Sequence, residues 1–145
     1  PNSKVSALDI SKDALEVAKE NAKLNNVNIE FVNADIFEYN FEKKYDIIVS
    51  NPPYITESEK IFMKKNVLHY EPELALFVKD NQELKYYEYI LNLANNILKN
   101  EGFIFFEINE NYTNNLKTVC KLNSFNSINF ILDLNKRSRF LFVKK

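Results

Sequence analysis

A chain of 145 residues fits a single domain, and a hydrophobic content of 46% is enough for a sizeable core. The net charge of −1 and the isoelectric point of about 6.0 leave no broad basic field, so we expect no direct nucleic-acid partner. Cys120 is the only cysteine, which excludes a disulfide framework or a zinc cluster. The sequence shows no signal peptide and no apolar run of transmembrane length, so we expect a soluble, cytoplasmic protein without membrane association.

The first part of the chain alternates strand and helix patterns. Lys4 to Leu8 is a short apolar run that predicts a strand, and Asp9 follows it directly. Ser11 is a suitable N-cap for an amphipathic helix that we expect to end near Leu24. Further strands are predicted at Ile29–Val32 and at Tyr45–Ser50, and the second of these is apolar enough to be a buried strand.

The second part of the chain continues the alternation after an irregular stretch from Thr56 to Leu68. The clearest helix is Glu83–Leu98, with one apolar face formed by Tyr87, Ile90, Leu91, Ala94, Ile97 and Leu98. A predominantly apolar strand, a helix and a terminal hairpin follow, at Phe103–Ile108, Glu110–Leu122, Phe125–Leu134 and Arg139–Val143.

This order predicts an α/β fold. Strands that alternate with helices favour a parallel sheet covered on both faces, and the terminal hairpin adds one antiparallel strand. Gly102 is the only glycine. A nucleotide-binding sheet normally has glycines where the backbone approaches its ligand, and this chain has no such loop.

Two acidic residues follow the first two strands. Ligands of open α/β sheets bind beyond the carboxyl ends of the strands, so Asp9 could accept from both ribose hydroxyls of an adenosyl group. Asp35 could accept from an adenine amino group, with Ile36 packed on the base. The alternative for Asp9 is an acid at a helix entry, and the alternative for Asp35 is a turn-forming residue.

The segment Asn51-Pro52-Pro53-Tyr54 directly follows the third predicted strand. The Asn51 carboxamide and the Pro52 carbonyl, whose direction the proline ring fixes, can both accept from one planar NH2 group. Two acceptors orient the nitrogen lone pair toward an incoming methyl group and stabilise the charge that develops during transfer. Tyr54 can stack on the planar group. The alternative is a proline-rich turn without a function.

Downstream of this segment, Glu71-Pro72 could fold over the site. Glu71 either contacts the substrate or is a structural acid. His69 is the only histidine and lacks visible partners, so we expect it to be a surface or packed residue and predict no metal site.

With these residues in place, the chain resembles the release-factor glutamine N5-methyltransferases (the HemK/PrmC family) over nearly its whole length. The resemblance rests on five segments: Asp9, Asp35-Ile36, Ser50–Ile55, Glu71–Leu76 and Phe106–Ile108, together with Asp133-Leu134 and Arg137–Arg139 in the final hairpin. It implies a class I methyltransferase fold and S-adenosylmethionine as cofactor. It also implies catalysis by Asn51, Pro52 and Tyr54, cofactor binding by Asp9, Asp35, Ile36 and Asn51, and substrate binding by Asn51 to Tyr54 and Glu71. The substrate would be the glutamine of the Gly-Gly-Gln motif in peptide chain release factors.

The chain departs from this family in lacking its first strand and the Gly-rich loop after that strand, which cradles the cofactor. We therefore expect residues 1–145 to form a partial methyltransferase catalytic domain with weak activity on its own. Two alternatives stay open. One is an N6-adenine DNA methyltransferase, because the adenine amino group is also a planar NH2. The other is a non-catalytic remnant that acts as a binding module.

Overall fold

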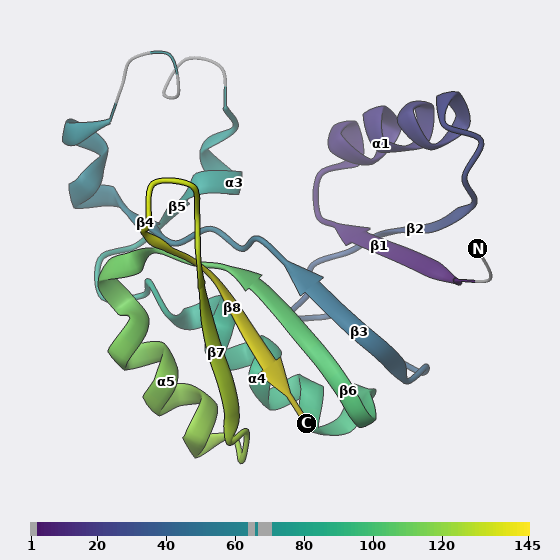
Figure 1. Ribbon diagram of the computed structural model, residues 1–145. Coiled ribbons are helices and arrows are strands. Elements are labelled where there is room, and N and C mark those ends of the chain that lie inside the picture. The colour runs from purple at the N-terminus through teal and green to yellow at the C-terminus, as the bar shows by residue number, and fades with distance from the viewer. Residues whose placement is uncertain (1–2, 64–65, 67–70) are drawn as a thin grey trace. The chain divides into compact units, whose positions relative to one another are not determined.

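The computed structural model describes residues 3–63, 66 and 71–145, and it divides into two compact units. Unit 1 is Pro1–Phe41 and unit 2 is Glu42–Lys145. Figure 1 shows the elements of both. Among the described residues, no helix is long and apolar enough to cross a membrane.

Unit 1 is a strand–helix–strand unit built from β1 (Val5–Asp9), α1 (Lys12–Leu24) and β2 (Ile29–Asn33). The strands pair in parallel, from Val5 opposite Ile29 to Asp9 opposite Asn33. Ser11 caps α1 as predicted, since its side chain accepts from the Ala14 N–H at 3.2 Å. The carboxyl ends of both strands therefore lie at one edge, which confirms the predicted arrangement of this segment.

Unit 2 contains a four-stranded sheet of β3 (Tyr45–Ser50), β6 (Leu98–Glu107), β7 (Ser127–Leu132) and β8 (Ser138–Lys144). The strand order is β3-β6-β8-β7. β3 and β6 are parallel, and β8 lies antiparallel to both β6 and β7. The hairpin thus adds one antiparallel strand, as predicted, and β8 is inserted between β6 and β7.

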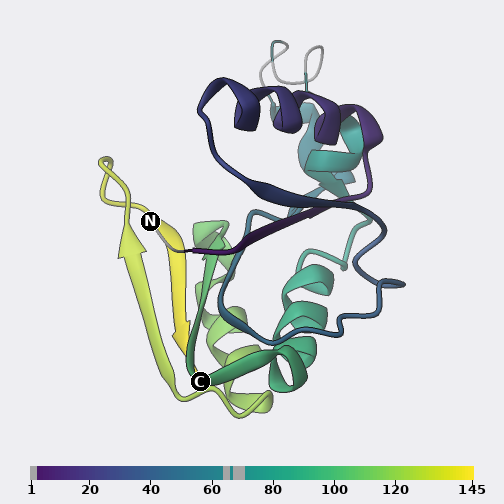
Figure 2. The same cartoon turned by 90° about the vertical axis from the view of Figure 1, so that its right-hand side faces the viewer.

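Two helices, α4 (Lys85–Ile97) and α5 (Thr113–Leu122), lie against the same side of this sheet (Figures 1 and 2). The apolar face predicted for α4 is buried, because Tyr87, Ile90, Leu91, Ala94 and Ile97 are each at most 7% exposed. Alternate residues of the strands meet these helices, and Ile104, Phe106, Leu141 and Val143 are at most 1% exposed. Phe125, after α5, is also buried. The core of unit 2 is therefore the layer between the sheet and its two helices.

The strands of the predicted α/β fold are divided between sheets, because β1 and β2 form a two-stranded sheet that is not hydrogen-bonded to the four-stranded one. The prediction that β3 is buried is wrong. Ile47 and Val49 are 54% and 75% exposed, so one face of β3 is uncovered in the part of the chain that the structure describes. A parallel strand at the edge of a sheet with helices on one side exposes its other face, whatever its hydrophobicity.

Several elements of the chain are short, and one of them, a 3₁₀ helix, lies in the described part of the stretch Thr56–Leu68 that was predicted to be irregular. β4 (Ile55–Thr56) pairs in parallel with β5 (Phe77–Val78), and the 3₁₀ helix η1 (Glu57–Phe62) follows β4. A capping box starts η1, since Glu59 Oε2 accepts from the Thr56 N–H at 2.9 Å. The other short elements are α3 (Glu73–Leu76) and η2 (Glu110–Tyr112).

Candidate functional site

The segment Asn51–Tyr54 lies between the end of β3 and the start of β4, at the carboxyl end of a parallel strand as predicted. Ser50 pairs with Phe106, so the segment lies level with the carboxyl end of β6. Asn51 is exposed, Pro52 is buried, and Pro53 and Tyr54 are half-buried. A buried proline therefore anchors the backbone while the preceding carboxamide faces solvent.

The hydroxyl of Tyr54 lies between a carboxylate and a guanidinium. The Tyr54 hydroxyl donates to Glu107 Oε1 at 3.1 Å, and Arg139 also interacts with the Tyr54 hydroxyl. Burial raises the pKa of Tyr54, the negative charge of Glu107 raises it further, and Arg139 acts in the opposite direction. Tyr54 is therefore a neutral phenol near pH 7, with its hydroxyl held by residues from β6 and β8.

The carboxyl end of β6 is itself held from both sides. The Tyr87 hydroxyl on α4 donates to the Glu107 backbone carbonyl at 2.8 Å, and the Tyr87 ring packs edge-on against Phe106 with 5.2 Å between centroids. On the other side, the Ile108 N–H donates to the Arg139 carbonyl at 2.9 Å. Burial strongly raises the pKa of Tyr87, so this donor keeps its proton.

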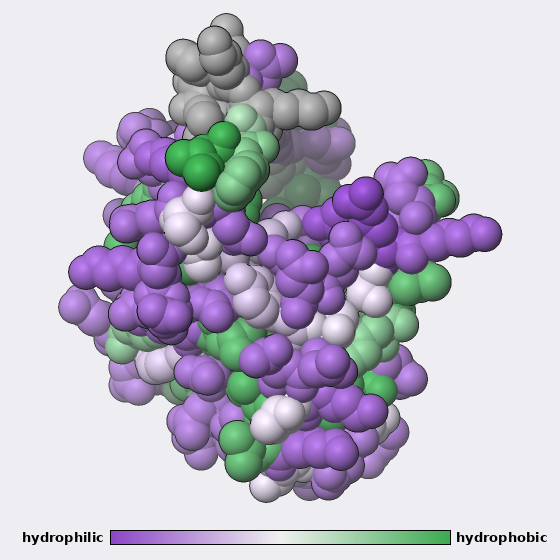
Figure 3. All heavy atoms as spheres, turned by 90° about the vertical axis from the view of Figure 1, so that its left-hand side faces the viewer, coloured by the Kyte–Doolittle hydropathy of each residue, from purple (hydrophilic) through white to green (hydrophobic). Residues whose placement is uncertain are grey.

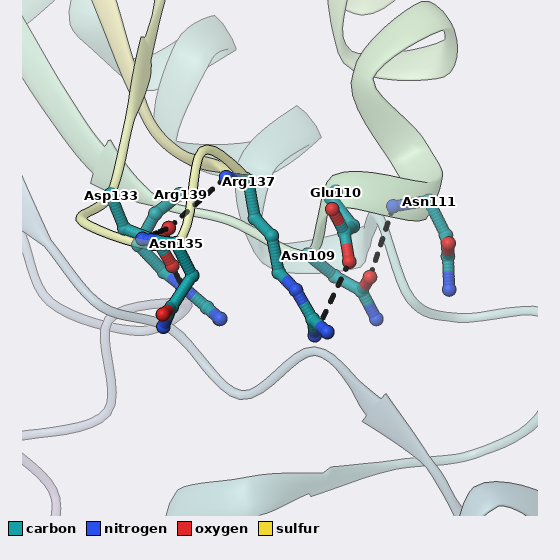
Figure 4. A network of polar contacts seen from close by, with 7 residues as sticks. All are labelled: Asn109, Glu110, Asn111, Asp133, Asn135, Arg137 and Arg139. Atoms are coloured by element: carbon teal, nitrogen blue, oxygen red, sulfur yellow. Dashed lines mark hydrogen bonds and ion pairs between the residues drawn. The ribbon is translucent and has the colours of Figure 1, made fainter.

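The turn between β7 and β8 is organised by Asp133 (Figure 4). Asp133 Oδ1 accepts from the N–H groups of Asn135 at 2.8 Å and Arg137 at 3.0 Å, and its Oδ2 lies 3.5 Å from Arg139 Nε. The backbone N–H of Arg137 is the main cause of the lowered pKa of Asp133. This turn therefore aims the Arg139 side chain at the end of β3.

A cavity of about 370 Å³ opens beside Tyr54. Its apolar wall consists of Tyr54, Ile55, Phe62 and Met63, and its polar wall consists of Glu59, Asn109, Glu110, Arg137 and Arg139. Arg137 pairs with Glu110 at 3.6 Å across the polar wall (Figure 4). Phe62 is 83% exposed. On the face shown in Figure 3, hydrophobic residues form separate patches among hydrophilic ones. The cavity therefore presents apolar and charged side chains together beside Tyr54.

In unit 1, Asp9 and Asp35 each form a local turn. Asp9 Oδ1 accepts from the Ser11 N–H at 2.8 Å, and Asp35 Oδ1 accepts from the Phe37 N–H at 2.9 Å. The structural alternatives considered for both residues are therefore realised. Within the described residues, the second oxygen of each carboxylate accepts no hydrogen bond. Asp9 is exposed, whereas Asp35 and Ile36 are half-buried, so each carboxylate can still receive a donor from a ligand.

The structure brings together only some of the predicted site residues. Asn51 to Tyr54 are contiguous in unit 2, and Asp9, Asp35 and Ile36 share one edge of unit 1. Glu71 is exposed, lies next to the N-cap of α3, and makes no hydrogen bond or ion pair with another residue that the structure describes. His69 lies outside the described residues. No group of three or more metal-ligating side chains occurs among those that the structure describes.

No role in the site was predicted for Glu107, Arg139 or Tyr87, although all three support the motif. Tyr87 was predicted only as part of a helix face, and the other two only as members of segments that resemble the family. One signal was available for Glu107, which is the only charged residue in the apolar run from Phe103 to Ile108. A carboxylate at the carboxyl end of such a strand is costly to bury without a partner, and the partner here is Tyr54. No comparable signal singles out Arg139.

Comparison with known proteins supplies the family. Residues 1–104 match the family model described as methyltransferase small domain. The chain is 40% identical over 143 residues to a release factor glutamine methyltransferase of Bacteroides thetaiotaomicron, covering 97% of this chain and 51% of the relative. It is 49% identical over 111 residues to a protein of the same name from Flavobacterium psychrophilum, covering 76% of this chain and 39% of the relative. The chain thus spans about half the length, or less, of these relatives.

Among solved structures, a methyltransferase from Pyrococcus furiosus matches with a TM-score of 0.71 and 21% identity, covering 99% of this chain and 64% of that protein. This likeness shows the class I methyltransferase fold, which the sequence predicted. The family match extends from unit 1 through β3 and the Asn-Pro-Pro-Tyr segment into β6. The chain therefore belongs to the methyltransferase small domain family.

Proposed function

We propose that residues 1–145 form part of the catalytic domain of an S-adenosylmethionine-dependent methyltransferase. Its substrate is the side-chain amide (N5) of the glutamine in the Gly-Gly-Gln motif of peptide chain release factors, which fits a cytoplasmic location. The observation that carries this proposal is the placement of Asn51–Tyr54 at the carboxyl end of β3, with an exposed carboxamide on an anchored backbone. The names of the relatives specify the glutamine substrate.

On the acceptor side, Asn51 and Pro52 bind the amide nitrogen. The Asn51 side-chain oxygen accepts one N–H of the substrate, and the Pro52 carbonyl accepts the other. The buried proline ring fixes the direction of its carbonyl, so little order is lost when the substrate binds. Pro53 keeps Pro52, the residue before it, in an extended conformation, and Tyr54 provides the flat wall against which the planar amide packs. Glu71 is a candidate for a further contact with the substrate chain.

On the cofactor side, Asp9 accepts from the ribose hydroxyls, Asp35 accepts from the adenine amino group, and Ile36 packs on the base. The chemistry of these groups fits the cofactor, because each carboxylate fixes itself to the backbone through one oxygen and keeps the other for a ligand donor. Asn51 is a further candidate for a contact with the cofactor. When bound, S-adenosylmethionine supplies an electrophilic methyl group.

The residues of the site act on the nitrogen rather than on a proton. Two acceptors on one NH2 group direct its lone pair away from both and stabilise the positive charge that it gains during transfer. The proton leaves to water after the transfer, so the chain needs no base at this position. The neutral phenol of Tyr54, with its raised pKa, agrees with a role in packing.

The test is methyl transfer from labelled S-adenosylmethionine to an intact release factor, using the protein translated from the whole reading frame that contains these residues. We expect label on the glutamine of Gly-Gly-Gln, located by peptide mass spectrometry. Asn51→Ala should lower kcat roughly a hundredfold or more. Because Asn51 is exposed, the same change should alter the free energy of unfolding by less than about 0.5 kcal/mol.

The matched control is Asn96→Ala, which removes an exposed carboxamide from α4 and should leave the rate unchanged. DNA is included as a second acceptor, since an adenine amino group presents the same two hydrogens. Label on DNA with none on the release factor would refute the proposed substrate, and no transfer at all would favour a binding module. For the 145-residue chain alone we expect weak cofactor binding, so micromolar affinity by calorimetry would contradict its assignment as a partial domain.

A further inference from the structure

We propose that Glu107 and Arg139 are positioning residues, which hold the Tyr54 ring as a fixed wall of the acceptor site. By this route the C-terminal hairpin takes part in substrate binding, although none of its residues needs to touch the reacting nitrogen. The inference rests on the proposed function, because it assigns a purpose to the orientation of Tyr54. It goes beyond that function in adding two residues from distant strands to the machinery.

The Tyr54 hydroxyl interacts with two side chains of opposite charge. A phenol has one hydrogen to donate and accepts through its oxygen. Glu107 takes the hydrogen at 3.1 Å, and Arg139 interacts with the Tyr54 hydroxyl as the oppositely acting cation. A ring that is held at its far end by a carboxylate and a cation cannot swing about its side-chain torsions without losing both contacts. The ring plane is thereby set relative to the Asn51–Pro53 backbone.

Glu107 and Arg139, the two residues that hold Tyr54, are fixed relative to each other. Glu107 is the last residue of β6, and Arg139 is the second residue of β8. The strands are joined at this level by the hydrogen bond from the Ile108 N–H to the Arg139 carbonyl at 2.9 Å. Tyr87 fixes the Glu107 backbone from the side of α4 at 2.8 Å. The supports of Tyr54 therefore belong to the rigid sheet and not to a loop.

Asp133 determines the direction of the Arg139 side chain. Its Nε lies 3.5 Å from Asp133 Oδ2, and the other oxygen of Asp133 is occupied by two backbone N–H groups of the turn. The Asp133 and Arg139 side chains are 19% and 34% exposed. A carboxylate locked by the turn thus aims the guanidinium, and Figure 4 shows the two side chains lying together. This is the support that a positioned side chain needs.

The Tyr54 ring lies beside the cavity. Tyr54, Arg139 and Ile55 all line the 370 Å³ cavity. The ring therefore forms part of the wall of this cavity. A ring that turned would change both the packing of the amide and the shape of this cavity. We therefore expect loss of either support to weaken substrate binding and to lower the rate.

The contact itself is tested without reference to activity. In the full-length protein with ¹³C-labelled tyrosine, the Tyr54 signal is assigned by its absence in Tyr54→Phe and titrated by NMR. Glu107→Gln should lower the pKa of Tyr54, because a negative charge is removed. Arg139→Met should raise it, because a positive charge is removed. A general loss of structure would shift both in the same direction, so the opposite signs distinguish positioning from unfolding.

The functional consequence is tested by a double-mutant cycle with a release-factor substrate. Tyr54→Phe keeps the ring and removes its hydroxyl, so it should lower kcat/KM roughly tenfold, as should Arg139→Met and Glu107→Gln. If the supports act through the hydroxyl, Tyr54→Phe combined with Arg139→Met should be no worse than Tyr54→Phe alone. The control Lys99→Met removes an exposed cation from the opposite end of β6 and should leave kcat/KM unchanged.

The outcomes separate the two proposals. A wild-type protein that methylates no release factor would refute the proposed function, and the titration would still decide whether the contact exists. An active wild type with fully additive effects in the cycle would overturn the positioning role. Opposite pKa shifts with unchanged kcat/KM in Arg139→Met and Glu107→Gln would also overturn it, since the contact would then have no bearing on the substrate.

Discussion

Gly102 should be intolerant of even one added methyl group, because the space at its Cα is already filled. A Cβ built there would lie 2.8 Å from Leu98 Cγ, 2.9 Å from Leu98 Cδ1 and 2.9 Å from the Lys99 carbonyl oxygen. Leu98 is only 1% exposed, so its side chain has no solvent to move into. The carbonyl belongs to the backbone of the first residues of β6. Both contacts must therefore be relieved by moving packed atoms.

Overpacking of this kind costs about 1–3 kcal/mol, so we expect Gly102→Ala to lower the free energy of unfolding by about 2 kcal/mol. For a chain of this length the melting temperature should fall by about 4–8 °C. The measurement is urea and thermal unfolding followed by circular dichroism. A loss below about 0.5 kcal/mol would refute the reasoning, because it would mean that Leu98 yields without cost.

The neighbouring residue provides a matched control. Glu101 has a φ of 62°, in the left-handed region, whereas Gly102 does not have a positive φ. Glu101→Gly relieves that strain but loosens the unfolded chain, and the two effects nearly cancel, so stability should change by less than about 1 kcal/mol. The double variant, Glu101→Gly with Gly102→Ala, should have the same lowered free energy of unfolding as Gly102→Ala. If Glu101→Gly instead rescued Gly102→Ala, the cause would be turn conformation and not space.

Three other predictions concern the core, the exposed strand and the hairpin. Burial raises the pKa of the Cys120 thiol from 9.0 to about 11, so its contribution to stability is present below pH 9 and is lost as the pH rises to about 11. Urea unfolding of wild type should weaken over that interval more than that of Cys120→Ala, and equal slopes would contradict this. Val49→Thr on β3 should change stability by less than about 0.5 kcal/mol, whereas Ile104→Val in the adjacent β6 should cost about 1 kcal/mol in the same titration. A cost above 1 kcal/mol for Val49→Thr would mean that the β3 face is covered. Asp133→Ala should speed amide hydrogen exchange in the hairpin turn, because two N–H groups lose their acceptor, and unchanged exchange would refute the role of Asp133.

The buried helix faces were predictable from the sequence because their apolar residues recur at a regular spacing. The apolar residues of α4 recur with the helical period over three turns, and one packed layer buries them all. The same holds for the helix start at Ser11, where a single side chain satisfies a free N–H. In contrast, β4 and β5 have two residues each, too few to show any period. Their pairing depends on the chain returning from Ile55 to Phe77, which is a tertiary event.

The exposed face of β3 was mispredicted for a related reason. Ile47 and Val49 are as apolar as any core residue, and a sequence pattern shows hydrophobicity but not the presence of a covering layer. Within the site, the location of Asn51–Tyr54 was predictable because a strand must end where two prolines follow. The contact between Tyr54 and Glu107 was not. It joins residues 53 positions apart and depends on how β3 and β6 align.

The electrostatics of Tyr54 bear on what kind of chemistry the site can perform. A general base near pH 7 needs a pKa close to that pH, and a tyrosine would have to be shifted downward to serve. Here burial and the carboxylate of Glu107 move the pKa of Tyr54 upward. Both influences keep the phenol neutral and leave its hydroxyl as a donor to Glu107. A residue arranged in this way is unsuited to removing a proton and suited to presenting a ring face. The geometry at the end of β3 therefore agrees with a transfer in which orientation of the nitrogen, and not its deprotonation, is the contribution of the protein.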